Sequence, residues 1–109
     1  MTSATEIVEL ARGMVGTRWH HQGRQRGAGV DCAGLCFCVA WEAGLQLPDF
    51  TGYSADPAQE VVRGAVAERL DQVGFEDLAP GCVVLVKSRP GIHDQHLGIY
   101  LGYDWVHAS

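Results

Sequence analysis

Three of the chain's four cysteines lie within seven positions, in the segment GVDCAGLCFCVAW that covers residues 29–41. Cys32, Cys36 and Cys38 follow C-x3-C-x-C spacing, whereas structural zinc sites favour pairs separated by two residues. On a helix, position 38 would also point away from the face that positions 32 and 36 share. Cysteines this close in one helix do not easily meet disulfide geometry. We therefore expect no metal and no disulfide, with Cys36 and Cys38 as buried packing.

Cys32 differs from the other two by its position at the first turn of an expected helix over residues 32–43. A thiol there faces the unpaired backbone N–H groups and the positive end of the helix dipole. Both favour the thiolate, so we expect a lowered pKa, and the same N–H groups could hold an oxyanion. Asp31 is expected to cap this helix. The residues predict a nucleophile, and an inert buried cysteine stays open as the alternative.

A base for this thiol is predicted among the five histidines. The alternation of a strand places His96, Gly98 and Tyr100 on one face. If residues 102–103 form a two-residue turn with Gly first, His107 lies opposite Gly98, about 7 Å along the strand from His96. Gly98 would then leave room for His107 to lean towards His96. A turn one residue later would place His107 opposite Tyr100, about 13 Å along, and separate the two rings. The first register predicts a base and an orienting imidazole.

The order of elements predicts one α+β domain over residues 1–109. Apolar spacing, Gly and Pro positions and capping residues give the expected elements in chain order. These are a helix over 5–15 capped by Ser3 and Glu6, a loop over 17–30, the helix over 32–43, an irregular segment over 45–55, a helix from Asp56 and Pro57 to Gly74, a turn at 80–81, and strands over 82–87, 96–102 and 105–109, with a loop over 88–95.

Charge and hydropathy exclude several classes of protein. The net charge is −5 and no basic run occurs, which argues against nucleic acids and anionic membranes as partners. No segment approaches the ~20 apolar residues of a membrane span. The N-terminus lacks a basic region followed by an apolar run, so we expect synthesis in the cytoplasm without a signal peptide.

Three segments together resemble the NlpC/P60 family of papain-like cysteine peptidases: DCAGL, then HLGIYLG, then VHA eleven residues after the first of these histidines. The upstream segment GTRWHHQGRQRGAGVDCAGL is most similar to the subgroup that phages and prophages encode, which is associated with tail assembly and cell-wall entry. The resemblance covers nearly the whole chain.

The resemblance implies a papain-like fold, in which a central helix carries Cys and packs on an antiparallel sheet that carries His. It implies hydrolysis of peptidoglycan stem peptides, often between γ-D-Glu and the following diamino acid, without metal or cofactor. By position, Cys32 matches the nucleophile, His96 the base and His107 the third polar residue. Asp31 and Trp19 match positions expected to contact the substrate, although many members have Tyr in place of Trp19.

The resemblance also implies phage tail proteins as partners and a location on the virion, acting on the cell wall. The chain ends two residues after His107, where relatives usually continue with further strands, so we expect the domain to be shortened at this end. Two other functions stay open. One is a structural or binding module of a tail with little hydrolytic activity. The other is an amidase or acyltransferase that uses the same Cys–His pair.

Overall fold

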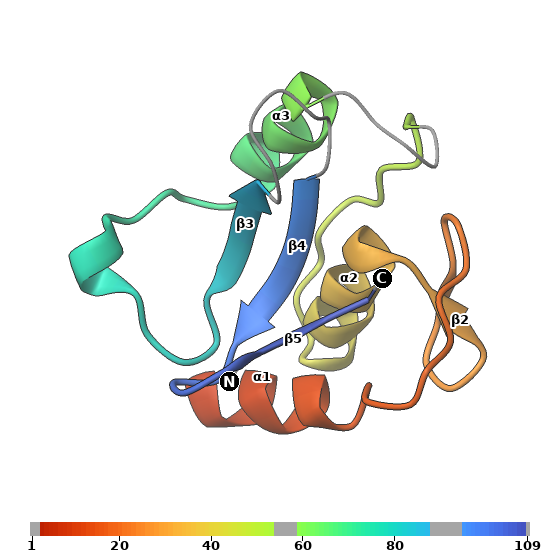
Figure 1. Ribbon diagram of the computed structural model, residues 1–109, viewed down its shortest axis with the longest axis horizontal. Helices are drawn as coiled ribbons and strands as arrows, with labels where there is room; N and C mark the ends of the chain where they lie inside the picture. The colour runs from red at the N-terminus through yellow and green to blue at the C-terminus, as the bar shows by residue number, and fades with distance from the viewer. Residues whose placement is uncertain (1–2, 54–58, 88–94, 109) are drawn as a thin grey trace.

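Helices precede an antiparallel sheet in the structure, a computed structural model that describes residues 3–53, 59–87 and 95–108. Within these residues the helices are α1 (Ala4–Arg12), α2 (Cys32–Glu42) and α3 (Gln59–Arg69). The main sheet holds β3 (Val83–Lys87), β4 (Gln95–Tyr100) and β5 (Trp105–His107). Shorter elements are β1 (Arg24–Gln25), β2 (Gly29–Val30) and the 3-10 helix η1 (Phe75–Asp77). The arrangement confirms the predicted α+β class (Figure 1).

Helix α1 begins where the sequence predicts, because the Ser3 hydroxyl accepts a hydrogen bond from the Glu6 amide at 3.2 Å. It ends at Arg12, three residues before the predicted end. The amide of Met14 bonds the carbonyl of Ala11 at 3.0 Å, so the chain tightens from four-residue to three-residue spacing there. The Met14 side chain is 2% exposed and still packs in the core.

Helix α2 is the buried central helix that the sequence predicts. Asp31 caps its first turn, and the helix ends before Gly44, whose φ of 92° suits glycine. It packs against α1 and β4, and Figure 1 shows it between the sheet and the β1–β2 hairpin. The core around it comes from four parts of the chain and contains Ala11, Met14, Val30, Leu35, Cys38, Val39, Ile99, Val106 and Ala108.

Helix α3 is shorter at its C-terminal end than the sequence predicts. It ends at Arg69, not at Gly74, and Val73 is 54% exposed instead of continuing an apolar stripe. The Arg69 guanidinium donates to the carbonyl of Ala65 in the helix and to the carbonyls of Pro48 and Asp49 outside it. Asp71 follows at once, and a negative charge there opposes the helix dipole. The predicted start at 56–57 and the loop over 88–94 lie outside the described residues.

The sheet has the strand order β3-β4-β5 with antiparallel pairing throughout. Between β4 and β5, the amide of Leu101 bonds the carbonyl of Asp104 at 2.8 Å and Gly102 has a φ of 107°. Gly98 therefore pairs with His107. This is the register that the two-residue turn predicts, and the alternative that separates the two histidines is wrong.

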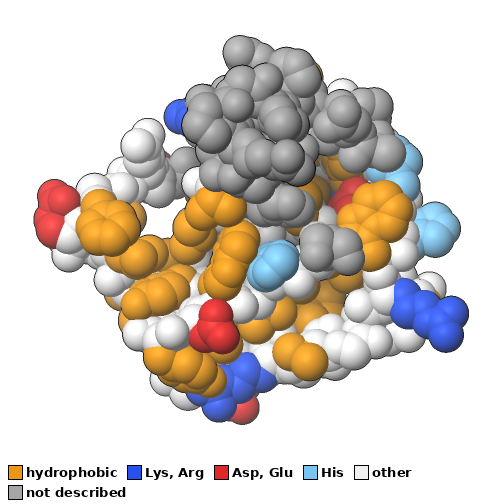
Figure 2. Space-filling view, in the orientation of Figure 1, with side chains coloured by type: hydrophobic (Ala, Val, Ile, Leu, Met, Phe, Trp, Pro, Cys, Tyr) orange, Lys and Arg blue, Asp and Glu red, His pale blue; other side chains and the backbone are white. Residues whose placement is uncertain are grey.

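Two further features of the fold are a short hairpin before α2 and a surface of hydrophobic side chains over β3 and η1. The segment over 17–30 contains the β1–β2 hairpin, which packs against α2. Figure 2 shows hydrophobic side chains gathered on the face over β3 and η1, where Phe75 is 89% exposed. No helix in the described part of the chain is long and apolar enough to cross a membrane.

Candidate functional site

Cys32 occupies the first turn of α2 and lines a cleft of about 940 Å³. The thiol-bearing residue is partly exposed, so a small molecule in the cleft has access to it. The same cleft is lined by Asp31, Trp19, His21 and Tyr53. Asp31 and Trp19, two residues that the sequence singles out before α2, therefore line the same cleft as the predicted nucleophile.

The pKa of the Cys32 thiol is raised above its ordinary value, chiefly because burial disfavours the thiolate. The carboxylate of Asp31 raises the pKa further, whereas the backbone N–H groups of Leu97, Ala33 and Cys32 itself lower it. The expected effect of the helix terminus is present, but burial outweighs it. The prediction of a lowered pKa is thus wrong, and the resting group is a thiol that needs a base.

Helix α2, which carries Cys32 in its first turn, packs against β4, and the backbone N–H of Leu97 in β4 is among the groups that lower the pKa of the thiol. His96 directly precedes Leu97, and its backbone pairs with Val86. The fold therefore brings the nucleophile to the strand that carries the predicted base.

His107 lies opposite Gly98, and its exposed ring stacks on Trp105 with ring centroids 4.3 Å apart. The sequence predicts open space over Gly98 for His107, but in the structure this space is filled. A Cβ built on Gly98 would lie 2.3 Å from the Trp105 ring, so this indole fills the position. The expectation that Gly98 leaves room for His107 to lean towards His96 is therefore wrong, because the Trp105 ring occupies that room.

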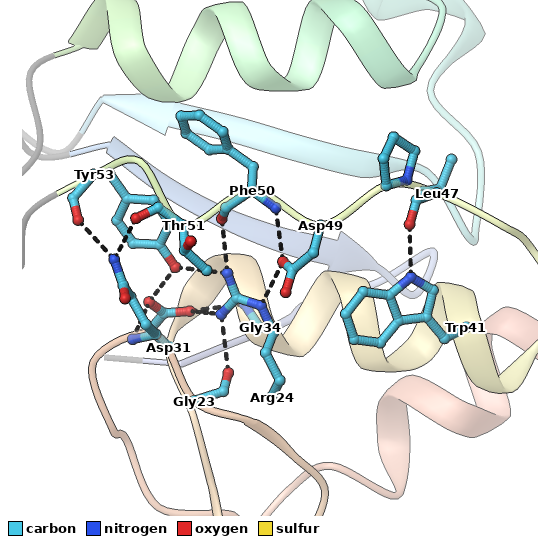
Figure 3. A network of polar contacts seen from close by, with 12 residues as sticks. Gly23, Arg24, Asp31, Gly34, Trp41, Leu47, Asp49, Phe50, Thr51 and Tyr53 are labelled. Atoms are coloured by element: carbon cyan, nitrogen blue, oxygen red, sulfur yellow. Dashed lines mark hydrogen bonds and ion pairs between the residues drawn. The ribbon is translucent and has the colours of Figure 1, made fainter.

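Asp31 is 3% exposed, and the chain itself supplies four hydrogen bonds to its carboxylate. One oxygen, Oδ1, accepts from the Gly34 amide at 2.7 Å and from Arg24 Nη1 at 3.1 Å. The other, Oδ2, accepts from the Gln22 amide at 2.8 Å and from the Tyr53 hydroxyl at 2.6 Å. The predicted helix cap is confirmed, and three further donors join it (Figure 3).

Arg24 is a residue that the sequence did not indicate, because one arginine in a polar, glycine-rich loop has no diagnostic spacing. Every nitrogen of its guanidinium donates within the chain, as Figure 3 shows. The acceptors are Asp49 for Nε at 2.9 Å, the Gly23 carbonyl and Asp31 for Nη1 at 3.0 and 3.1 Å, and the Phe50 carbonyl and the Tyr53 hydroxyl for Nη2 at 3.0 and 2.9 Å.

Gln22 fastens the same segment from the other side. Its side-chain amide donates to the carbonyls of Thr51 at 2.6 Å and Tyr53 at 2.9 Å. Gln22 also has a φ of 56°, a left-handed conformation that costs free energy in residues other than glycine. Segment 49–53 is therefore held across the start of α2 by two side chains from the loop that precedes it.

The rings of Trp19, His21 and Tyr53, which contact one another in sequence, line the cleft that also contains Cys32. Trp19 is 45% exposed and stacks on His21 with centroids 6.4 Å apart. His21 meets the edge of Tyr53 at 5.7 Å. The exposed indole of Trp19 offers an apolar surface to a bound molecule, in the cleft where the sequence predicts a substrate contact.

Cysteines and metal-ligand residues outside this site have ordinary surroundings. All four cysteines lie in the described part of the chain, and none forms a disulfide bond. Cys38 is 4% exposed in the core, as predicted, whereas Cys36 is only partly buried and packs against the core from outside. Within residues 3–53, 59–87 and 95–108, no three His, Cys, Asp or Glu side chains gather as metal ligands would.

The sequence model of the NlpC/P60 family matches residues 16–109, which is most of the chain. The match includes α2, the whole of the sheet and the loop that carries Arg24. A search of curated proteins gave no match.

Proposed function

The chain belongs to the NlpC/P60 family, and on this premise we propose that it is a cysteine peptidase that cleaves peptidoglycan stem peptides. Membership of the family implies cell-wall peptidase activity in general terms. The finer proposal is cleavage between γ-D-Glu and the diamino acid that follows it. Cys32 acts as the nucleophile, His96 as the base and His107 as the residue that orients His96.

The proposed reaction has two steps. The Cys32 sulfur attacks the carbonyl carbon while His96 takes the thiol proton, and the backbone N–H of Cys32 donates to the developing oxyanion. When the C–N bond breaks, His96 returns the proton to the leaving amine and a thioester remains. His96 then takes a proton from water, whose oxygen attacks the thioester carbon, and the proton goes to the departing Cys32 sulfur. The second step releases the acid.

The position of the Cys32 thiol carries this proposal. It combines the first turn of a buried helix, an open cleft and the packing of this helix against the strand that carries His96. The raised pKa supports a mechanism in which the base removes the proton as the attack occurs, because little thiolate exists at rest. The exposed ring of Trp19 supports its proposed role as a substrate contact.

Incubation with purified peptidoglycan tests the proposal, with released stem fragments measured by mass spectrometry. Wild type should release fragments that end in γ-D-Glu, and Cys32→Ala should release none. Cys82→Ala is the matched control, since it removes a partly exposed thiol at the start of β3, and it should keep activity. His96→Ala should abolish release, whereas His107→Ala should reduce it. Equal blank results for wild type and Cys32→Ala would refute the peptidase.

The second candidate function is a tail module that keeps the fold with little hydrolysis. The exposed apolar side chains of Val73 and Phe75 favour it, because an assembly protein needs such contact surface. The resemblance of the loop before α2 to phage and prophage proteins supports a place in a tail for either function. Binding of the protein to peptidoglycan without release of fragments would select the module.

A further inference from the structure

We infer that Arg24 and Tyr53 are positioning residues for the nucleophile: they hold the buried carboxylate of Asp31, which in turn holds the first turn of α2 and Cys32. The inference rests on the proposed role of Cys32. It gives Asp31 a different part from the substrate contact that the family resemblance implies. Asp31 acts inward, on the helix that carries the thiol.

The hydrogen bonds of Asp31 argue against a contact with substrate. An ionised carboxylate offers about four acceptor positions. Four donors of the chain occupy the two oxygens at distances between 2.6 and 3.1 Å, and the residue is 3% exposed. A substrate donor would have to displace one of these donors and enter a buried space. The positive guanidinium of Arg24 also meets the charge that a cationic substrate group would otherwise seek.

Arg24 joins three separate parts of the chain. It belongs to β1, its Nε and Nη2 groups reach Asp49, Phe50 and Tyr53, and its Nη1 group reaches the cap of α2. Its guanidinium also lies over the Phe37 ring, 5.3 Å from the centroid. A planar group with five donors is needed here, and the single ammonium of lysine cannot replace it.

Tyr53 completes the arrangement, because its hydroxyl accepts from Arg24 and donates to Asp31. The chain of contacts ends at the first turn of α2, where Asp31 accepts from the Gly34 amide. The Cys32 sulfur and the Cys32 amide proposed for the oxyanion lie in this same turn. A displacement of about 1 Å in such a turn can cost on the order of 100-fold in rate.

The test uses two conservative variants of the full chain, Tyr53→Phe and Arg24→Lys. Each has a matched control that loses a comparable contact elsewhere. Tyr100→Phe loses a hydroxyl bond to the Gly102 carbonyl, and Arg26→Lys loses a paired contact to Glu42. The readouts are the rate of Cys32 alkylation by iodoacetamide against pH, followed at that peptide by mass spectrometry, and kcat and KM on soluble stem-peptide fragments.

For Tyr53→Phe and Arg24→Lys we expect kcat to fall about tenfold while KM stays within about twofold of wild type. This pattern indicates the loss of an interaction made only in the transition state. We also expect the pH midpoint of Cys32 alkylation to move upwards, because the Asp31 charge is less well balanced. The controls should match wild type in both readouts. The alkylation rate of Arg24→Lys should lie between those of wild type and Arg24→Ala, since lysine keeps the charge but not the planar set of donors.

Three results would overturn the inference. The first is an alkylation profile and a kcat equal to those of wild type in both Tyr53→Phe and Arg24→Lys. This result would overturn the inference even if the variants unfold at a lower temperature. The second is a raised KM with unchanged kcat, which would make these residues substrate contacts. The third is an equal loss in the controls. Because alkylation needs no peptidoglycan, a shifted profile in a protein without hydrolytic activity would support positioning while the peptidase proposal fails.

Discussion

Replacement of Asp31 by alanine should remove a large part of the stability of the fold. The loss of the helix cap costs about 1 kcal/mol. The change also leaves the Arg24 guanidinium, 13% exposed, without its buried partner. Breaking a buried ion pair costs about 3–5 kcal/mol, and the lower end applies because Asp49 remains on Arg24 Nε. We expect a loss of about 4 kcal/mol from a total of about 5–15 kcal/mol.

Urea unfolding followed by tryptophan fluorescence measures this loss. Asp49→Ala is the matched control, because Asp49 bonds the same guanidinium but is 40% exposed. An exposed pair contributes about 0–1 kcal/mol, so this control should stay close to wild type. The melting temperature should fall by about 15 °C in Asp31→Ala and by a few degrees at most in Asp49→Ala. Equal losses in the two variants, or a loss below about 1 kcal/mol in Asp31→Ala, would contradict the claim that the buried Asp31 carboxylate stabilises the fold.

Three other predictions follow from glycines and thiols of the fold. Gly34→Ala places a Cβ 1.9 Å from the Gly23 carbonyl and should destabilise by about 1–3 kcal/mol, whereas Gly64→Ala, which meets nothing within 4 Å, should be neutral or stabilising in urea unfolding. Gly98→Ala must displace the Trp105 ring, on which the His107 ring stacks, so the release of peptidoglycan fragments should fall. Unchanged release would show that the position of the Trp105 ring does not affect catalysis. Burial raises the pKa of Cys36, so the folded state keeps this proton to higher pH than the unfolded state does. The free energy of unfolding should therefore fall above about pH 8.5, and less steeply in Cys36→Ala.

Elements with their own local signals could be predicted from the sequence. Ser3 and Asp31 are capping residues directly before apolar runs, and both caps occur in the structure. Gly102 predicts the two-residue turn, and this turn fixes the partner of His107. In each case a residue acts on neighbours within a few positions, so its type and spacing suffice.

Contacts between distant segments could not be predicted in the same way. Arg24 meets Tyr53 across 29 positions, and nothing in either residue's neighbours indicates the other. The raised pKa of Cys32 has a similar origin, because the burial that causes it comes from the packing of the whole cleft. The ring of Trp105 over Gly98 was missed since strand parity gives a face but not the volume that a side chain fills. The roles of His96 and His107 in catalysis stay predictions.

Strand β3 has a consequence for the behaviour of the protein at high concentration. It is the edge strand of the sheet in the described part of the chain, and its sequence, VVLVK, carries a single charge at its end. An edge of this kind presents unpaired backbone groups and favours strand pairing between molecules. Valine-rich strands without proline are also prone to aggregation. We expect the first intermolecular contacts in concentrated solutions to form along β3, so a second lysine there should improve solubility.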